Sequence, residues 1–226
     1  MTLDVAYNYL NFEVNKVFGT YYAPGDFDLI VDRAQMSLYN DYYMQFGASQ
    51  RLNDAMAPFK RSIVFTESEC PTGLVQVPSD YEHLLSLYTI TQNAITGLPY
   101  NRPVPILNED EKVWRDNNQI YPPSLIDPYG IIVQNWNVQL YPAVPQAGVL
   151  YYLNRPPAPK YVYSVVSGRV IVYDPINSVQ LAWADKDQNS ILIKALSTLG
   201  INVREQDVIG YAESKSSQNL EGPDKI

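Results

Sequence analysis

The chain has few of the residues that most catalytic and metal-binding sites use. Its 226 residues include one cysteine, Cys70, and one histidine, His83. A single cysteine excludes an internal disulfide and fits a reducing compartment. One cysteine and one histidine are also too few to supply the four ligands of a structural zinc ion. We therefore expect neither a metal site nor a cofactor.

Sequence motifs of nucleotide binding and of nucleophilic hydrolysis are missing as well. The chain has no Walker loop, no G-x-G-x-x-G and no G-x-S-x-G. A Ser-His-Asp arrangement would have to use His83, which lies in the segment SDYEHLL. Ser79 and Glu82 match a helix capping box there, so we expect His83 to be a polar residue on the exposed side of a helical turn. The sequence predicts no catalytic residue.

Basic residues and long apolar runs are also scarce. Sixteen Lys and Arg stand against 24 Asp and Glu, giving a formal charge of −8. This balance argues against a protein that grips nucleic acid by neutralising phosphates. No segment approaches the roughly 20 apolar residues of a membrane span, and the first residues lack the basic start of a signal peptide. We expect a soluble product made in the cytoplasm.

Tyrosine and proline, by contrast, are abundant. The chain has 19 tyrosines against six phenylalanines, together with 17 prolines, and 46% of its residues are hydrophobic. Tyrosine suits half-buried strand positions and protein interfaces, and proline enforces turns. This composition predicts a folded protein with a core and a loop-rich β region.

Apolar residues recur at helical spacing near both ends of the chain. The first run ends at Gly19, and further helices are expected over about residues 26–46 and 49–59. Near the other end, an apolar stripe precedes Gly200 at the C′ position, and a last helix is expected over about residues 204–214. The main apolar positions of these helices are Leu3, Tyr7, Leu10, Val14, Val17, Phe27, Ile30, Val31, Ala34, Leu38, Tyr42, Ile191, Leu192, Ala195, Leu196 and Leu199.

Short strand-like runs separated by turn residues fill the middle of the chain. Two hairpins are predicted, one around Gln134 and Asn135 and one turning at Ser167-Gly168. Asn108 and Glu111 form a second capping box, which opens a short helix through Trp114.

This order of elements predicts an α+β fold. We expect the terminal helices to pack as a bundle with an inserted antiparallel β region. The expected parts are N-terminal helices over residues 1–62, the β-rich insertion over 63–183, C-terminal helices over 184–213, and a flexible tail over 214–226.

One segment imitates a calcium-binding loop. Asp185, Asp187 and Asn189 have the spacing that begins an EF-hand. Position six is Ser190 instead of glycine, and position twelve is Leu196 instead of the bidentate glutamate. The two aspartates are better explained as acids at the start of a helix, where the helix dipole favours them.

Carboxylate pairs and tryptophans leave two further alternatives open. Glu67 with Glu69, or Glu109 with Asp110, could serve as the acid and base of a glycoside hydrolase, although such runs are usually solvated. The three tryptophans could form a sugar platform, but core positions are favoured. Alternation in QNWNVQ predicts that Trp136 points inward.

The order of several loose motifs resembles the head-to-tail adaptor proteins of tailed bacteriophages. After the N-terminal helices come QVPSDYEHLLSLY at residues 76–88, NVQLYP at 137–142 and YYLNRPPAP at 151–159. The acidic start of the helix at 185 and the following segment to residue 215 continue the resemblance. Each motif is weak alone, and their order over most of the chain carries the similarity.

The resemblance implies a structural protein of the virion neck, not an enzyme. Such proteins form a homo-oligomeric ring, typically of twelve subunits, beneath the portal protein. The ring extends the channel for double-stranded DNA, which passes without specific binding, and supports other tail or ring proteins. An acidic lumen would let DNA slide. The composition favours a short-tailed phage, and a crAss-like phage fits it.

Two groups of residues are expected to make contacts in such an assembly. The tail would dock on the portal through Ser214, Lys215, Asn219, Leu220, Pro223 and Ile226. Trp114, Tyr141 and Tyr151 are expected at interfaces between subunits or with partners. The long β region distinguishes this chain from short adaptors. The chain could therefore form a later ring of the stack instead of the first ring under the portal, or it could carry attachment sites for fibres.

Two rival classes remain from the sequence. A receptor-interacting or other binding module of the virion would use the β region to face its ligand and would form no ring. A hydrolase that uses two carboxylates would need a concave acidic site.

Overall fold

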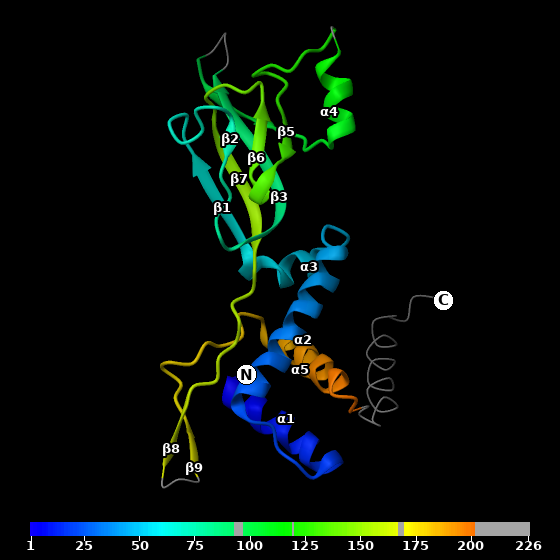
Figure 1. The fold of residues 1–226 in the computed structure, drawn as a ribbon, viewed down its shortest axis with the longest axis vertical. Coiled ribbons are helices and arrows are strands. Elements are labelled where there is room, and N and C mark those ends of the chain that lie inside the picture. Colours follow the sequence, from blue (N-terminus) through cyan, green and yellow to red (C-terminus); the bar gives the residue numbers. More distant parts are fainter. Residues whose placement is uncertain (93–96, 119, 167–169, 202–226) are drawn as a thin grey trace, which may run out of the picture. The chain divides into compact units, whose positions relative to one another are not determined.

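The computed structural model describes residues 1–92, 97–118, 120–166 and 170–201. The chain forms two compact units, which are described separately. The helical unit combines Met1–Ala55 with the chain from Pro156 onward, and the β unit comprises Met56–Arg155. Helices and antiparallel sheets together confirm the α+β class (Figure 1).

Four helices of the helical unit lie in the described part of the chain. They are α1 (Leu3–Phe18), α2 (Pro24–Met44), α3 (Gln50–Ala55) and α5 (Asp185–Thr198). Gly19 ends α1 with a left-handed φ of 65°, as the sequence predicted. The side chain of Thr2 caps the start of the helix. Among the described helices, none has the length and apolar character that a membrane span requires.

The helices from the two ends of the chain share one core. Helix α2 packs against α5, and α1 also contacts α5. Most of the predicted apolar positions are buried, but Val17, in the last turn of α1, is 53% exposed, contrary to the prediction. The residues of this core include Leu3, Leu10, Val14, Phe27, Val31, Tyr39, Ile191, Leu192, Ala195 and Leu196.

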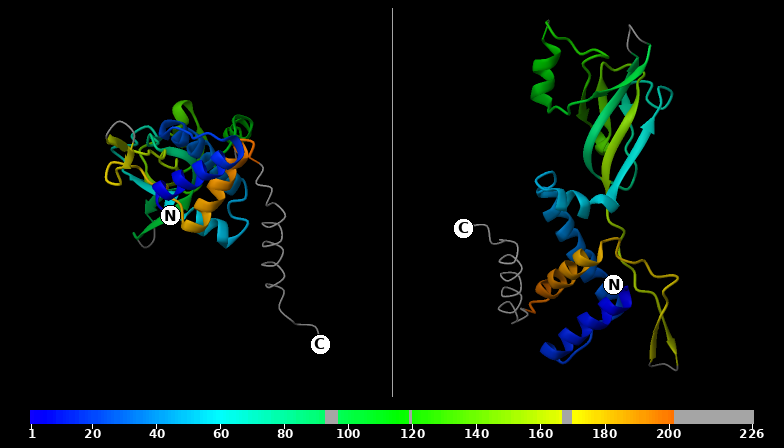
Figure 2. Two further views of the ribbon diagram at one scale, coloured as in Figure 1. Left: turned by 90° about the horizontal axis from the view of Figure 1, so that it is seen from below. Right: turned by 180° about the vertical axis from the view of Figure 1, so that it is seen from behind.

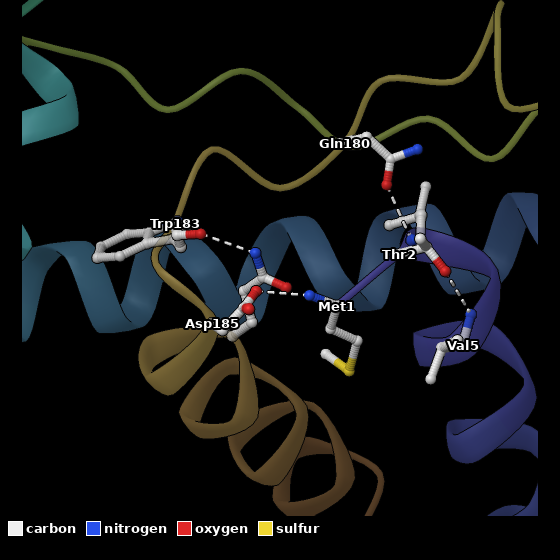
Figure 3. Close-up of polar contacts among 8 residues, drawn as sticks. Met1, Thr2, Val5, Gln180, Trp183 and Asp185 are labelled. Atoms are coloured by element: carbon white, nitrogen blue, oxygen red, sulfur yellow. Dashed lines mark hydrogen bonds and ion pairs between the residues drawn. The ribbon is translucent and has the colours of Figure 1, made fainter.

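Polar contacts fix the start of α1 to the segment that leads into α5 (Figure 3). The backbone N–H of Leu3 donates to the side chain of Gln180 at 2.9 Å, and the amino group of Met1 lies 2.5 Å from Asp185. Gln188 donates to the carbonyl of Trp183 at 2.7 Å. The contacts of Met1 and Leu3 join residues nearly the whole chain apart, whereas that of Gln188 is local.

A two-stranded hairpin, β8 (Tyr163–Val166) and β9 (Val170–Tyr173), belongs to the helical unit and extends away from its helices (Figure 2). Tyr161 lies at its root and is buried. The Tyr161 hydroxyl donates to Asp4 at 2.8 Å, and its backbone N–H donates to Asp28 at 2.8 Å. Its ring lies 4.6 Å from that of Tyr7. The hairpin is therefore anchored on α1 and α2.

Two antiparallel sheets make up the β unit. The larger has the order β1-β7-β3-β4, and the smaller has the order β2-β6-β5. Both sheets supply side chains to one buried core that includes Phe65, Leu87, Val138, Leu140 and Leu150. The strands are β1 (Lys60–Phe65), β2 (Leu74–Val75), β3 (Tyr81–Gln92), β4 (Pro99–Pro103), β5 (Tyr129–Ile132), β6 (Val138–Tyr141) and β7 (Ala147–Asn154).

Short helical elements complete the β unit. Helix α4 (Glu109–Asp116) begins with the predicted capping box, in which Asn108 and Glu111 accept each other's backbone N–H groups at 2.8 and 3.0 Å. A 3₁₀ turn, η1 (Ala57–Phe59), precedes β1, and a second, η2 (Gln134–Trp136), connects β5 with β6. The predicted hairpin around Gln134 is therefore confirmed.

Two expectations differ from the structure. The capping box at Ser79 and Glu82 starts no helix, because Tyr81 already begins β3, where it pairs with Asn154 of β7. The chain is also divided differently from the expected insertion over 63–183. The insertion comprises residues 56–155, and residues 156–183 with their hairpin belong to the helical unit.

Candidate functional site

The single histidine and the single cysteine occupy structural positions. His83 lies on β3, not on a helical turn as expected, and burial lowers the pKa of its imidazole. Cys70 is buried in the core of the β unit, and burial raises the pKa of its thiol. Within the described residues, no three or more His, Cys, Asp or Glu side chains group closely enough to hold a metal ion.

The candidate carboxylate pairs lie in local, solvent-exposed settings. Glu69 accepts hydrogen bonds of 2.8 Å from both the backbone N–H and the hydroxyl of Thr66, and these bonds lower the pKa of its carboxyl group. Glu109 and Asp110 are exposed in the first turn of α4, where the helix dipole favours acids. A carboxyl group with a lowered pKa is poorly suited to act as a general acid near neutral pH.

Helix α4 is held on the smaller sheet by one side (Figure 1). Asp116 accepts hydrogen bonds from Lys112, at 2.6 Å, and from the hydroxyl of Tyr129. These bonds, that from Lys112 above all, lower the pKa of Asp116. The Lys112 ammonium lies 4.8 Å from the ring centre of Tyr141, which stacks on Tyr129. Tyr141, an expected interface residue, is thus half-buried and engaged in anchoring α4.

Large apolar side chains are exposed near α4 and on the β5–β6 turn. The exposed fractions are 81% for Trp114, 80% for Ile120, 65% for Ile126 and 67% for Trp136. The inward orientation expected for Trp136 is wrong, because the residue sits in the turn and not on a strand. Only Trp183 of the three tryptophans is buried. The exposure of Trp114 leaves it accessible for the expected contact.

Tyr151, the third expected interface residue, lies on β7 and is 42% exposed. Its ring meets that of Tyr88 edge-on at 6.0 Å. Together with Ser86, Asn101 and Val149 these two rings line a shallow hollow on the larger sheet.

The expected portal-docking residues Ser214, Lys215, Asn219, Leu220, Pro223 and Ile226 lie outside the described residues, as does the expected helix over 204–214.

The hairpin β8–β9 presents an apolar face that sequence reasoning did not single out. Register pairs Tyr163 with Tyr173 and Val165 with Ile171. These four side chains share one side of the hairpin, because paired and alternate residues point the same way; they are called the hairpin face. Tyr163, Val165 and Ile171 are 42%, 55% and 43% exposed.

Helix α1 carries a second apolar stripe. Val5, Tyr9 and Phe12 lie on the side opposite to the buried Leu3, Leu10 and Val14, as the spacing i, i+4, i+7 requires. These three residues, the α1 stripe, are 53%, 46% and 64% exposed. The stripe therefore leaves apolar surface exposed on this side of the helix.

Both surfaces had a signal in the sequence. Val5, Tyr9 and Phe12 repeat at helical spacing, just out of phase with the core residues. The hairpin face needs the strand register as well, because the apolar run YVYSVV alone does not tell which side faces the core.

In comparisons with known proteins, no family model matches this sequence, and neither does any curated protein.

Proposed function

We propose that the protein is a structural component of a phage head-to-tail connector, forming a homo-oligomeric ring that extends the DNA channel. The order of the sequence motifs along the chain is the reason for choosing this class of protein. The observation that carries it in the structure is the pair of exposed apolar surfaces on the helical unit, the hairpin face and the α1 stripe. An acidic protein that exposes such surfaces is suited to assembly with other subunits.

The charge of the chain fits a DNA conduit better than a DNA-binding site. A formal charge of −8 per subunit would be multiplied around a ring and would repel the phosphate backbone from the wall. DNA would then pass without specific contacts.

Native mass measurement and negative-stain microscopy test the proposal directly. The full chain would be measured alone and after mixing with its candidate portal protein. A closed ring in either sample supports the proposal and gives the number of subunits. A chain that stays monomeric in both samples contradicts it.

A second candidate is an attachment or binding module of the virion. The exposed Trp114 and Trp136 of the β unit favour it, because tryptophan is enriched at the energetic centres of interfaces. In this case the chain would remain monomeric, and Trp114→Ala would weaken binding to a tail or fibre protein.

A hydrolase that uses two carboxylates is the least supported class. Two double variants test this class: Glu67→Ala combined with Glu69→Ala, and Glu109→Ala combined with Asp110→Ala. A structural protein should still fold and assemble in both. Loss of a glycan-degrading activity in either double variant would contradict the structural assignment.

A further inference from the structure

The hairpin face has the properties of an arm that is covered in the functional state. An isolated two-stranded hairpin is at best marginally stable in water. This one extends from the helical unit (Figure 2). Among its described side chains, ring contacts lie at the root, where the ring centre of Tyr161 is 4.8 Å from that of Tyr173 and 6.3 Å from that of Tyr163. Beyond the root, Val165 and Ile171 remain 55% and 43% exposed.

The edges of the larger sheet differ from this hairpin in how they are protected. Edge strand β4 begins and ends with proline, at Pro99 and Pro103, and edge strand β1 begins with Lys60 and Arg61. Proline and basic residues discourage pairing with other chains. The described residues of β8 and β9 include neither.

The α1 stripe is a second surface of the same chemistry on the same unit. No charged residue interrupts it between Val5 and Phe12 on that side of the helix, and Lys16 follows one turn later. Glu13, four residues after Tyr9, lies at the border of the stripe, so the rim carries one acidic and one basic residue while Val5, Tyr9 and Phe12 are uncharged. In a chain with a net charge of −8, two copies approach most easily through such uncharged parts of their surfaces.

The exposed areas are sufficient for a specific contact. With the fractions given above, Val5, Tyr9, Phe12, Tyr163, Val165 and Ile171 expose on the order of 600 Å². The apolar part of a small specific interface, roughly 60% of about 1,200 Å², is of similar size.

We propose that the hairpin face of one copy docks on the α1 stripe of the next copy. The two surfaces differ, so the contact is heterologous, and each copy keeps one free surface of each kind. Repetition of such a contact generates a ring when the rotation closes. This inference rests on the proposed function, because it names the contact between neighbours in the proposed ring.

Complementation between two variants tests the contact. Phe12→Asp removes the α1 stripe and leaves the hairpin face, whereas Ile171→Asp does the reverse. Each places a charge in the contact and should weaken self-association by about 30-fold or more. Mixed in equal amounts, the two variants should form a heterodimer, in which the hairpin face of the Phe12→Asp variant docks on the α1 stripe of the Ile171→Asp variant. This dimer cannot grow, because its two remaining surfaces both carry the introduced charge. Native mass measurement distinguishes this species from monomers and rings.

Leu29→Asp is the matched control. Leu29 lies on α2 and is 62% exposed, close to the 64% of Phe12, so it presents a similar apolar area outside the two surfaces. This variant should assemble like the unaltered chain. If it abolishes assembly equally, association is a general effect of apolar exposure and the assigned contact is wrong. Far-ultraviolet circular dichroism of all variants checks that they fold.

Cysteine crosslinking gives a second, independent test. The native Cys70 is buried, so Phe12→Cys combined with Val165→Cys introduces the reactive pair. Oxidation should join separate chains into a ladder that ends at the ring. Crosslinks confined within single chains would show that the hairpin covers its own α1 stripe, which overturns the proposal.

The two hypotheses fail in different ways. If the unaltered chain forms rings and both Phe12→Asp and Ile171→Asp do so too, the ring function stands and this contact is wrong. If the unaltered chain is monomeric with and without the portal, the ring function fails. If the variant with Phe12→Cys and Val165→Cys then also forms no crosslinks between chains, the proposed contact is wrong as well.

Discussion

Trp136 is held in a backbone conformation that its side chain disfavours. Its φ is 63° and that of the preceding Asn135 is 59°. Asparagine tolerates this left-handed region, but for a bulky residue it is uncommon and costs roughly 1–2 kcal/mol. The β5–β6 turn thus keeps an exposed tryptophan where glycine would be more stable.

Trp136→Gly should therefore stabilise the β unit by about 1 kcal/mol. Urea unfolding followed by circular dichroism measures the change. Trp136→Ala is the control, because it removes the ring but keeps the backbone penalty. Equal stability of the glycine and alanine variants would contradict the argument.

The Tyr42 hydroxyl links α2 to the buried Asp187 at the start of α5. It donates a hydrogen bond of 2.9 Å to that carboxylate. Burial, followed by the hydrogen bond and the charge of Asp187, raises the pKa of Tyr42 to about 12. In the unfolded chain the phenol ionises near its usual pKa of about 10.

A raised folded-state pKa contributes stability below the unfolded pKa, and this contribution is lost as the pH rises toward the folded value. The free energy of unfolding of the unaltered chain should thus exceed that of Tyr42→Phe at pH 8, and the difference should shrink between about pH 10 and 12. Urea unfolding at several pH values measures this difference. A difference for Tyr42→Phe that is constant with pH would contradict the assignment.

At the scale of residues, the sequence predicted which side chains are buried far better than it predicted which side chains contact one another. The apolar stripes of α1, α2 and α5 follow from helical spacing. The role of Tyr161 does not, because its partners Asp4 and Asp28 lie more than 130 positions away in the chain. Trp136 was misplaced because alternation describes strands and fails in the turn between them.

Among the elements, two similar capping boxes had opposite outcomes. After Asn108 the chain continues with EDEKVWRD, whose charged residues favour a short exposed helix. After Ser79 it continues with DYEHLLSLYTIT, and β3 pairs with β7 on one side and β4 on the other. The strand pairing and the β-branched residues outweigh the local capping signal there.

Asn108→Ala should loosen α4 selectively. Loss of the cap costs about 1 kcal/mol, and this exposed helix depends on local contacts. Hydrogen exchange should accelerate several-fold over residues 109–116 while strand β7 keeps its protection. Asn40→Ala, within α2, is a control for the loss of an asparagine elsewhere, and a global loss of protection in Asn108→Ala would contradict the local role.

Strand β7 passes through the larger sheet at Gly148 with no room for a side chain. A Cβ there would overlap the carbonyl oxygen of Tyr88 and lie 2.5 Å from the ring of Phe65. Gly148→Ala should therefore destabilise the β unit by roughly 2–4 kcal/mol or prevent its folding. Thermal unfolding measures the loss. Gly25→Ala, where nothing lies within 4 Å, should leave the melting temperature unchanged or raised.

On the scale of the whole molecule, the chain enters and leaves the β unit at neighbouring points, because Lys60 near its start pairs with Leu153 near its end. Its core is made by its own residues. A fragment of residues 56–155 should therefore fold alone, with a cooperative thermal transition and dispersed amide resonances. A fragment of residues 1–55 should not, since α5 supplies part of its core. Folding of that second fragment to a stable monomer would contradict the division.

The boundary of the insertion was the main feature of the whole molecule that the sequence did not reveal. Residues 156–183 are rich in strand-forming residues, so their composition groups them with the β region. Their membership of the helical unit depends on Tyr161 and on Gln180, which bonds the start of α1. Such long-range contacts are set by packing, and local patterns carry no information about them.

The division of the chain also has a consequence for biosynthesis. At the ribosome, α1 and α2 emerge first but lack their partner α5 until residue 185 and beyond have been made. The whole of the β unit is translated in that interval, which lasts several seconds at roughly 5–20 residues per second. The inserted unit therefore has time to fold before the unit that flanks it, and the outer helices wait longest for their own completion.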